Sequence, residues 1–372
     1  MVKMIPQSLL KEPYQYYGDS PTIKQYTLWK LYDYYIEKLV RNQIPVGGSS
    51  GIFREEYDVV YDGTSVKSNK IEIYETRPLG IISPRKDKLS KIHYYLIKNH
   101  AYRVILRNGN YKLLFTAPLY EAIIPQHLII DVYDKVSLEL NLDYNNTGSL
   151  RSTFIEIHLH DSSKLDLLIN LNDSINSPSN IDIGIKQEKY TLLNLIYLAT
   201  VGKMTRLIIT DLLDGEDSES NIRGIVFSTK QSRIDNIADI ISRNRDTYSK
   251  YLFTSLISDN GVVAQRGLGK ILDNAWGSGI EYYSEALLLS DEARAYLQPR
   301  LEIDTGDVRI AKHAARNIHV LPEQIFYLQT RGIDYNLARK LVIKGYLLKE
   351  IPTTTYTPEI VSSIEKTLNN II

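Results

Sequence analysis

The chain has 372 residues, enough to bury a sizeable core in one elongated domain or in a core with appended helices. Its 44 Lys and Arg residues balance 44 Asp and Glu residues, so the formal net charge is zero and the basic footprint of a nucleic-acid-binding protein is missing. Because there is no cysteine, the chain itself forms no disulfide and supplies no thiolate to a metal.

The first segment with helical periodicity is Thr22–Arg41. Its apolar residues recur at intervals of three and four, and it contains neither proline nor glycine, which predicts an amphipathic helix. The residues before it lack the apolar core of a signal peptide, and the longest apolar run, Thr191–Gly202, is too short to span a bilayer. We therefore expect a cytoplasmic chain without a membrane partner.

A glycine- and serine-rich break follows this segment. Gly47–Gly51 reads GGSSG and formally matches the G-x-S-x-G pattern, in which Ser49 would be a nucleophile. That motif requires a strand before the serine and a helix after it, and neither is predicted here. A flexible linker is the favoured interpretation, and it closes an N-terminal helical region over residues 1–50.

From Glu55 to Ile310 the hydrophobic pattern changes to period two. Alternating runs such as VSLELNLDY, STFIEIHLH, KLDLLINLN and SNIDIGIK are separated by turns rich in Asn, Asp, Ser and Gly, which predicts a strand-rich core. A two-strand unit recurs at about 27 residues, within the range of solenoids and β-helices. The predicted fold class is mainly β, with a β-helix core over residues 51–318.

After Leu321 the pattern becomes helical again. A first helix is predicted from Pro322 to the basic residue and glycine at Arg331-Gly332. A second follows over residues 335–351 as far as the break at Pro352, and a third starts at Pro358. These helices form a predicted C-terminal helical domain over residues 319–372.

Three polar side chains alternate in the run IEIHLH. Glu156, His158 and His160 point to one face of the predicted strand, where the His-x-His pair could chelate zinc. The same alternation is typical of the polar outer face of a half-buried strand, with the intervening Ile157 and Leu159 in the core. This second interpretation is favoured, and no metal is assigned to these residues.

Other histidines and acidic residues give weaker signals. His93 and His100 lie seven positions apart among aromatic residues, so packing or surface roles are expected. The acidic segment Asp211–Asn221 does not have calcium-loop spacing and reads as a solvated turn. Pairs of carboxylates such as Glu281 and Glu285, or Asp304 and Asp307, would suit glycoside hydrolysis, but such spacings are common in proteins of every kind.

No P-loop, HExxH zinc motif or dinucleotide-binding motif occurs in the chain. Nucleotidase, metalloprotease and dehydrogenase functions therefore lack the residues that would carry them. The residues by themselves do not demonstrate an enzyme, and we expect a non-catalytic protein.

Two C-terminal stretches carry a resemblance to a known family. The first, Leu287–Arg316, reads LLLSDEARAYLQPRLEIDTGDVRIAKHAAR, and the second, Pro322–Leu347, reads PEQIFYLQTRGIDYNLARKLVIKGYL. Together they resemble the C-terminal signature of the SufB/SufD family of iron-sulfur cluster assembly proteins: LLLS-x-x-A, P-x-LEI, a SHGAT or EHEAT segment, and FYL-x-x-RGI. The chain departs from this pattern at Ala314, which replaces the Gly or Glu after the histidine, and at Arg316, which replaces the closing Thr.

The resemblance implies a right-handed parallel β-helix between N-terminal and C-terminal helical regions. It also implies two partners, a SufB subunit and the ATPase SufC, and it leaves a homodimer open when SufB is absent. SufB-type chains are expected to supply a scaffold cysteine, so a chain without cysteine fits the SufD type better, although an atypical SufB-type chain also stays open. The implied function is a scaffold subunit; the rival interpretation is a β-helix carbohydrate-active enzyme or a structural solenoid.

His313 aligns with the histidine of the SHGAT or EHEAT segment. The resemblance implies that it lies at the interface with SufB and is a candidate iron ligand there, with no tightly bound cofactor but a transient iron-sulfur cluster. Neutral imidazole is a competent ligand for iron. A lone histidine beside Ala314 and Ala315 is also commonly a packed or capping residue, and this alternative stays open.

The resemblance implies that the helices after Leu321 dock the ATPase, and these helices carry aromatic and arginine side chains of the kind typical of interface centres. The alternative is that Ile325, Leu328 and Leu341 mainly hold the helices to one another, and opposite faces of one helix can serve both purposes. The candidate partner-binding residues are Gln324, Tyr327, Leu328, Arg331, Gly332 and Tyr346.

Overall fold

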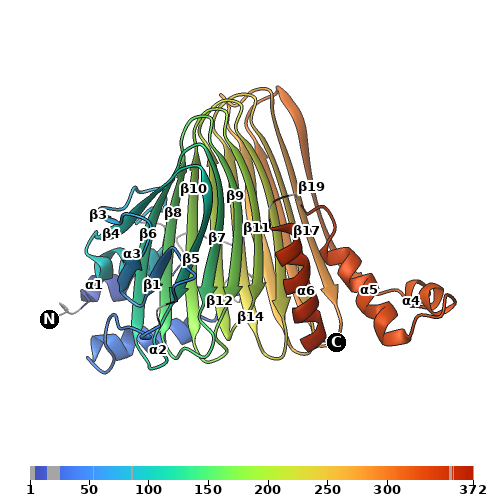
Figure 1. Cartoon of the computed structure of the whole chain (residues 1–372), viewed down its shortest axis with the longest axis horizontal. Coiled ribbons are helices and arrows are strands. Elements are labelled where there is room, and N and C mark those ends of the chain that lie inside the picture. Colours follow the sequence, from blue (N-terminus) through green and yellow to red (C-terminus); the bar gives the residue numbers. More distant parts are fainter. Residues whose placement is uncertain are drawn as a thin grey trace.

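A computed structural model describes residues 5–14, 26–52, 54–84, 87–351, 354 and 356–371. Strands make up 48% of the chain and helices 17%, and the strands wind into a parallel solenoid of about eight turns (Figure 1). Helices lie at both ends of the solenoid. The predictions of a mainly β class, of a parallel β-helix and of flanking helices are confirmed.

Two sheets form the walls of the solenoid, and from β4 (Ala101–Leu106) onward successive strands alternate between them. We call them the odd sheet and the even sheet after the numbers of these alternating strands. Within each sheet the strands pair in parallel, except that β1 with β2 and β3 with β4 are antiparallel. The odd sheet contains, in spatial order, β2 (Ser65–Ser68), β1 (Val59–Asp62), β5 (Gly109–Thr116), β7 (Lys135–Asp143), β9 (Lys164–Asn172), β11 (Leu192–Thr200), β13 (Glu219–Ser228), β15 (Tyr248–Ile257), β17 (Ser278–Leu288) and β19 (Val308–His319). The even sheet contains β3 (Tyr74–Thr76), β4 (Ala101–Leu106), β6 (Ile123–Val132), β8 (Leu150–Leu159), β10 (Pro178–Gln187), β12 (Met204–Leu213), β14 (Arg233–Ser242), β16 (Val262–Ile271) and β18 (Arg294–Ile303).

The repeat predicted from the sequence is the repeat of the coil. Pro178 pairs with Met204, 26 positions later, and Val262 pairs with Arg294, 32 positions later. Side chains at paired positions project from the same face of the sheet, so residues one repeat apart stack in columns. The period-two pattern therefore selects which residues fill the lumen, and the repeat decides which of them touch.

The lumen is filled by these stacked columns. One column runs through Leu138, Leu167, Leu195 and Ile222, each in register with the next and each buried in the central core. Burial of apolar surface stabilises such a stack by roughly 25 cal/mol for each Å² removed from water. The strands thus depend on long-range stacking for their stability.

The outer face of the odd sheet has a second apolar layer. Outward-facing residues such as Leu168, Ile196 and Ile225 are buried against the C-terminal helices, through Ile360 and Ile364 among others. The helices that cover them are α5 (Tyr335–Leu347) and α6 (Thr357–Ile371); α4 (Pro322–Gln329) precedes them. This cover explains why several odd-sheet strands are apolar on both faces. Of the predicted C-terminal features, the break at Pro352 lies outside the described residues.

Three helices pack at the other end: α1 (Gln7–Leu10), α2 (Trp29–Val40) and α3 (Lys88–Ile97). The helix predicted over Thr22–Arg41 is observed as α2, while residues 22–25 lie outside the described part of the chain. Its buried residues Tyr32 and Ile36 belong to one cluster with Ile123 and Leu150 of the even sheet. No helix in the described ranges is both long and apolar enough to cross a membrane.

Helix α3 was not predicted, because it lies inside the segment read as strands. Its N-cap is Asp87, whose carboxylate accepts hydrogen bonds from the Ser90 backbone N–H (2.8 Å) and from Arg206 Nη2 (2.6 Å). Arg206 lies on β12, more than one hundred residues later, so a contact invisible to local pattern reading holds the helix start in place. On the inner side of α3, the ring of His93 stacks on Phe154 at 3.7 Å, and burial lowers the pKa of His93 well below its usual value.

The GGSSG segment is held in place instead of forming a free linker. The Gly47 N–H donates to Ile123 O at 2.9 Å, the Ser50 N–H donates to Asp62 Oδ1 at 2.6 Å, and the Ser49 hydroxyl donates to the same carboxylate. Gly63 has a φ of 59°, and a Cβ there would lie 1.7 Å from Gly48 O. The linker interpretation is therefore wrong, because tertiary hydrogen bonds join the segment to the first turn of the coil.

The position of Asp211 shows that the segment Asp211–Asn221 is not a wholly solvated turn. Asp211 lies on β12, fully buried, and accepts hydrogen bonds from Gln187 Nε2 at 3.0 Å and from Ser220 Oγ. Burial raises the pKa of this carboxyl to about 6, although both hydrogen bonds act in the opposite direction. The protonated form is therefore favoured in the fold well above the pH at which a free aspartate ionises.

We predict that Asp211 makes the folded state less stable as the pH rises. Its folded pKa exceeds its unfolded pKa, so its stabilising contribution is complete below about pH 4. That contribution is lost as the pH rises through about 6. Asp211→Asn is expected to remove this loss, which amounts to about 3 kcal/mol between acidic and neutral pH. Urea denaturation of both proteins across this pH range measures the difference.

Asp291→Asn, at an exposed turn, is the matched control and should leave the pH profile unchanged. Parallel stability profiles for the original protein and Asp211→Asn would contradict the prediction.

Candidate functional site

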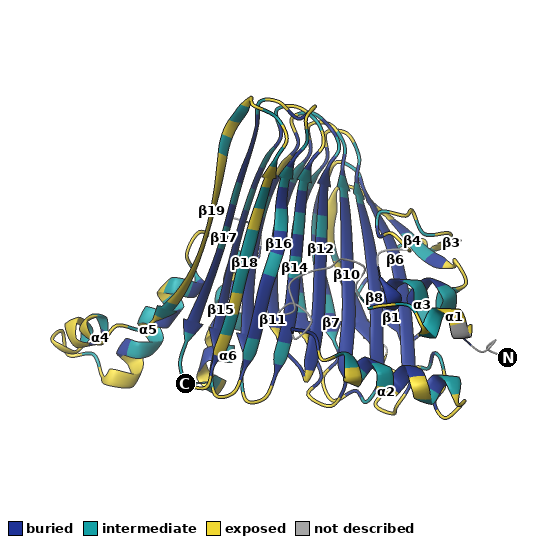
Figure 2. Ribbon diagram, turned by 180° about the vertical axis from the view of Figure 1, so that it is seen from behind, coloured by how far each residue is buried: buried dark blue, intermediate teal, exposed yellow. Residues whose placement is uncertain are grey.

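The C-terminal end of the solenoid is open. In the described part of the chain, β18 pairs only with β16, and β19 pairs only with β17, so each presents an unpaired backbone edge. Both strands consist of intermediate and exposed residues, whereas most residues of the strands before them are buried (Figure 2). Unpaired strand edges are ready templates for pairing with another chain.

His313 lies on β19 at this open end. It is in register with Tyr282 on β17, which is in register with Tyr251 on β15, and this column continues to Ile222 in the lumen. Tyr251 and Tyr282 are fully buried, but His313 is exposed because no further strand follows it. His313 is therefore not a packed residue of this chain; it ends a lumenal column with its imidazole accessible.

Behind His313 the lumen is polar. Tyr197 and Tyr251 join their hydroxyls at 2.8 Å, Gln265 Nε2 donates to the Tyr282 hydroxyl at 3.0 Å, and that hydroxyl donates to Ala238 O at 2.9 Å. Burial raises the pKa of Tyr251 and of Tyr282 well above the usual value. The column beneath the histidine is thus a neutral, fully buried hydrogen-bonded network.

A pocket of about 310 Å³ lies between the edge of the odd sheet and the end of α5, beside Ala314. The charged groups on its wall are paired: Arg316 Nη2 lies 2.7 Å from Glu285 Oε1, and Lys250 Nζ lies 2.6 Å from Glu350 Oε2. Arg316, one of the departures from the family signature, is therefore held by a salt bridge to the neighbouring strand.

Three of the four carboxylates considered for glycoside hydrolysis, Glu281, Glu285 and Asp304, are also engaged. Glu281 accepts hydrogen bonds from Tyr248 (2.6 Å) and Tyr283 (2.7 Å), and the bond from Tyr248 is the main cause that lowers the pKa of Glu281. Asp304 Oδ2 lies 3.3 Å from Lys270 Nζ. A glycosidase acid needs a raised pKa, and the environment of Glu281 acts in the opposite direction.

The helical hairpin α4–α5 follows β19 after only two residues and projects away from the solenoid (Figure 1). The predicted partner-binding residues lie on it. Tyr327, Arg331 and Gly332 are exposed, Leu328 and Tyr346 are half-buried, and Gln324 Nε2 donates to the Tyr346 hydroxyl at 3.3 Å. Ile325 is buried, as expected for a residue that holds the helices together, but Leu341 is 41% exposed and does not serve that purpose.

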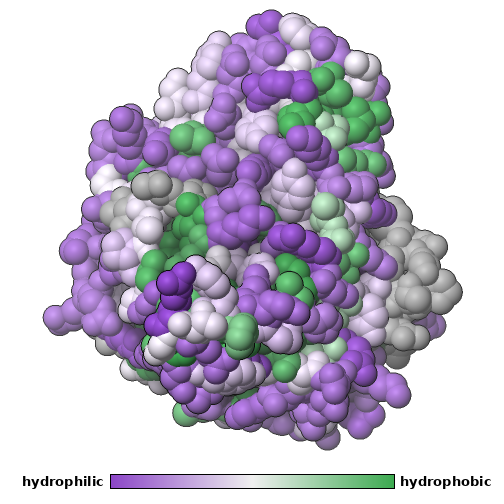
Figure 3. Space-filling view, turned by 90° about the vertical axis from the view of Figure 1, so that its right-hand side faces the viewer, coloured by the Kyte–Doolittle hydropathy of each residue, from purple (hydrophilic) through white to green (hydrophobic). Residues whose placement is uncertain are grey.

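Other exposed apolar side chains on the hairpin were missed by sequence reasoning. Phe326 on α4 is 67% exposed, and Leu337 and Leu341 on α5 and Leu321 just before α4 are also exposed. Figure 3 looks onto this end of the molecule, where apolar patches interrupt a largely hydrophilic surface. The available signal was that adjacent positions 325–328 are all apolar, so one helix face cannot bury them all.

One buried arginine fastens the base of the hairpin. Arg223 on β13 donates from Nη2 to Leu347 O at 2.9 Å and from Nε to Lys349 O at 3.1 Å, both at the C-terminal end of α5. A cation at this position satisfies terminal carbonyls and complements the helix dipole. Burial lowers the pKa of Arg223 to about 10, with the nearby Glu285 opposing that effect.

Comparison with known proteins now identifies the family. Residues 116–346 match the family described as "SUF system FeS cluster assembly, SufBD core domain". The chain belongs to the SufBD family. The matched range extends from β5 to α5, so it includes the open end of the solenoid and the exposed hairpin.

Several SufBD relatives are similar to this chain. It is 23% identical over 274 residues to the iron-sulfur cluster assembly protein SufD of Plasmodium berghei, covering 70% of this chain and 20% of the relative. It is 31% identical over 160 residues to SufD of Bacillus subtilis, covering 42% and 36% respectively. A SufBD family protein of Mycobacterium tuberculosis is 38% identical over 95 residues, 25% of this chain and 24% of the relative. The chain thus spans at most about a third of the length of these relatives.

The family prediction is confirmed. The relatives named SufD and the absence of cysteine support the SufD type.

We predict that Arg223→Leu loosens the attachment of the C-terminal helices while the solenoid stays folded. The substitution leaves the terminal carbonyls of α5 without their donor, at a cost of about 1–3 kcal/mol for each buried group left unsatisfied. Hydrogen exchange should accelerate across α5 and α6 and stay unchanged in β7 to β11, which Arg223 does not contact through a hydrogen bond.

Arg243→Leu removes an exposed arginine paired with Asp214 and serves as the control. Equal exchange in α5 and α6 for both variants would show that Arg223 does not fasten the hairpin.

Proposed function

We propose that this chain is a scaffold subunit of a SUF iron-sulfur cluster assembly complex. In this proposal the open end formed by β18 and β19 pairs with a SufB-type subunit, and the α4–α5 hairpin docks the SufC ATPase. The observation that carries it is the combination, within a SufBD core, of two unpaired strand edges and an exposed apolar hairpin directly after the last strand. ATP hydrolysis is assigned to the partner, because this chain has no P-loop.

The proposed role of His313 is to supply one ligand to a transient iron-sulfur cluster that is assembled and passed on as cargo. Its exposure at the end of the lumenal column supports this role, since an imidazole buried under a further strand could not reach iron held between subunits. Imidazole is a suitable ligand for iron, and the remaining ligands would come from the partner.

The connection between hairpin and strand suggests how ATP hydrolysis would act on this interface. Only Val320 and Leu321 separate β19 from α4, and Ile318 and Val320 pack with the cluster that holds α5 and α6. A displacement of the hairpin by a docked ATPase would therefore act directly on the strand that carries His313. Such a coupling requires two arrangements of the hairpin whose balance nucleotide binding shifts.

We predict that coexpression with SufB and SufC from the same source gives a stable complex of all three chains. The double substitution Phe326→Lys and Tyr327→Lys is expected to lose the ATPase and retain SufB, since it places two charges in the exposed apolar surface. Size exclusion with light scattering measures each mass, and the chain alone tests the homodimer.

Tyr190→Lys changes an exposed tyrosine on the solenoid and is the control. A monomeric chain in every mixture and nucleotide condition would refute the scaffold proposal.

For His313→Ala we expect unchanged folding and unchanged complex mass but a cluster yield at least about tenfold lower, as is typical when the support of a metal site is removed. Reconstitution followed by iron and sulfide analysis gives the yield. His319→Ala, an exposed histidine on the same strand, should retain the full yield. Equal yields from the original protein and His313→Ala would rule out this role.

A further inference from the structure

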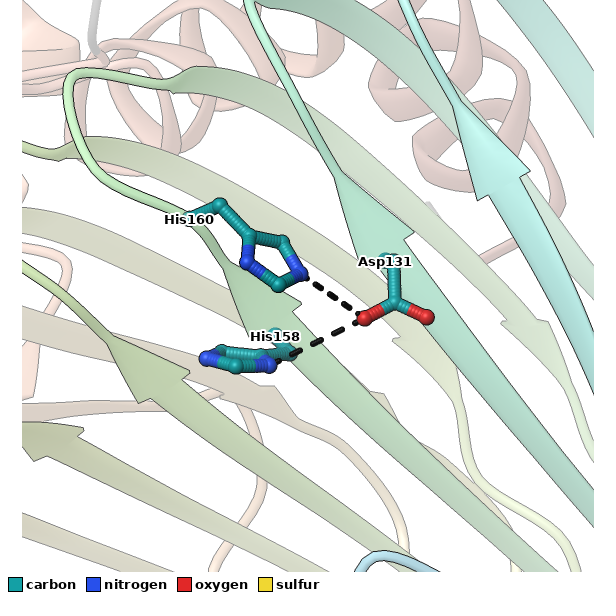
Figure 4. Close-up of side chains that lie close together, drawn as sticks. All are labelled: Asp131, His158 and His160. Atoms are coloured by element: carbon teal, nitrogen blue, oxygen red, sulfur yellow. Dashed lines mark hydrogen bonds and ion pairs between the residues drawn. The ribbon is translucent and has the colours of Figure 1, made fainter.

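A second group of potential metal ligands lies on the even sheet, five strands away from the open end. Asp131 on β6 is in register with His158 on β8, and His160 follows one residue beyond that strand. The three side chains converge on one point outside the lumen (Figure 4). The stacking of the coil thus adds to the His-x-His pair a carboxylate that lies 27 positions earlier in the sequence.

The spacing of the ligand atoms suits a small divalent ion. Asp131 Oδ1 lies 2.9 Å from His160 Nε2 and 3.7 Å from His158 Nδ1, and the ligand atoms of all three lie within 4.8 Å of one another. Ions with bonds of about 2.0–2.1 Å in tetrahedral or octahedral geometry separate neighbouring ligands by about 2.9–3.4 Å. The distance from Asp131 Oδ1 to His160 Nε2 lies in this range and the distance to His158 Nδ1 is slightly above it, so an ion fits once the two imidazoles, whose ligand atoms lie within 4.8 Å, close around it.

Asp131 is fully buried and fixed. Its second oxygen, Oδ2, accepts a hydrogen bond from Arg103 Nε, which leaves Oδ1 directed at the two imidazoles. Burial raises the pKa of Asp131, but the hydrogen bonds from Arg103 and His160 outweigh that effect and the net pKa is lowered. The carboxylate is thus ionised and oriented before any ion arrives.

Both imidazoles are also held in position. His158 Nε2 lies 2.9 Å from Glu188 Oε1, and Lys186 Nζ lies 2.6 Å from the same oxygen. A carboxylate bound to the far nitrogen of a histidine is the usual support of a metal-ligating imidazole, because it sets the tautomer and raises the basicity of the ligating nitrogen. The ring of His160 stacks on Tyr133, with centroids 4.0 Å apart.

Glu156, the acidic residue that the sequence places beside the two histidines, is not part of this group. It is fully buried and accepts hydrogen bonds from the backbone N–H groups of Gly80 (2.9 Å) and Ile82 (3.0 Å) and from that of Leu79. Its oxygens therefore fasten the segment before α3 to the even sheet. The histidines take their acidic neighbour, Asp131, from the preceding turn of the coil.

We propose that Asp131, His158 and His160 form a binding site for a divalent transition-metal ion of the zinc or iron(II) class. Two imidazoles and one carboxylate are the donor set of such ions, whereas Mg²⁺ and Ca²⁺ prefer oxygen ligands alone. The side chains of His158 and His160 are 18% and 25% exposed, so the ion reaches the site from solvent and keeps positions for water. The site is separate from His313 and requires no partner chain.

Titration of the chelator-treated full chain with Zn²⁺ tests the proposal, using calorimetry for stoichiometry and affinity. Co²⁺ absorption reports the coordination geometry. We expect one Zn²⁺ ion per chain and an affinity for Mg²⁺ at least a hundredfold weaker than that for Zn²⁺. His158→Gln and His160→Gln should each weaken binding at least tenfold with the melting temperature of the apo chain nearly unchanged.

His313→Gln, at the open end, and His100→Gln, on the surface beside Glu75, are the matched controls and should bind as the original chain does. Loss of binding in His313→Gln with retention in His160→Gln would place the ion at the strand edge and overturn the proposal. Absence of a one-to-one site at 0.1 mM Zn²⁺, about the weak limit for a specific ion site, would overturn it too. All of these titrations use the chain without SufB or SufC, so their outcome does not depend on the scaffold proposal.

Discussion

Parallel stacking at a nearly constant repeat is the constraint on which the rest of this molecule depends. From β6 onward the strands of each sheet pair with neighbours about one turn away in the sequence, so each lumenal side chain rests on one from the previous turn. A slip of one residue in any strand would turn its lumenal residues to the outside. The same register that stacks Leu167 on Leu138 also places Tyr282 beneath His313 and Asp131 beside His158.

The two ends of the solenoid differ in structure. At the first end, short antiparallel strands close both sheets, and α1, α2 and α3 pack nearby. At the second end the described residues leave β18 and β19 uncovered, while α5 and α6 cover the outer wall of the odd sheet. Among the described residues, long strands with a bare edge occur only at the second end, whereas β2 and β3 at the first end are short, and a long bare edge favours association.

Much of the fold was predictable because period-two alternation and helical periodicity are local signals. The alternating runs became strands, and the helices before and after them were found close to their expected positions. Helix α3 was missed because its capping aspartate is held by Arg206 from a distant turn, and the GGSSG segment was misread because its hydrogen bonds reach Ile123 and Asp62. In each case a long-range contact outweighed the local pattern.

The candidate sites, too, were found partly from local sequence signals and partly only from the packed structure. Sequence reasoning located His313 and most of the hairpin residues through the family signature, and the match over residues 116–346 bears out the family. The exposure of Phe326 and the pairing of Arg316 with Glu285 required the packed structure. Alternation shows that Glu156, His158 and His160 share a face, but it carries no information about what covers that face.

By itself, then, the sequence determined the fold class, the order of helices and strands, and the family, because each of these is written in local periodicity or in a contiguous motif. Only the tertiary structure decided which residues are accessible and which meet across turns. Glu156 is sealed beneath Leu79 to Ile82, whereas His158, two positions later, remains partly open and faces Asp131. Such differences arise because the exposure of a residue depends on the segments that cover it, and its neighbours depend on the repeat length of the coil. Both are set by residues far away in the sequence.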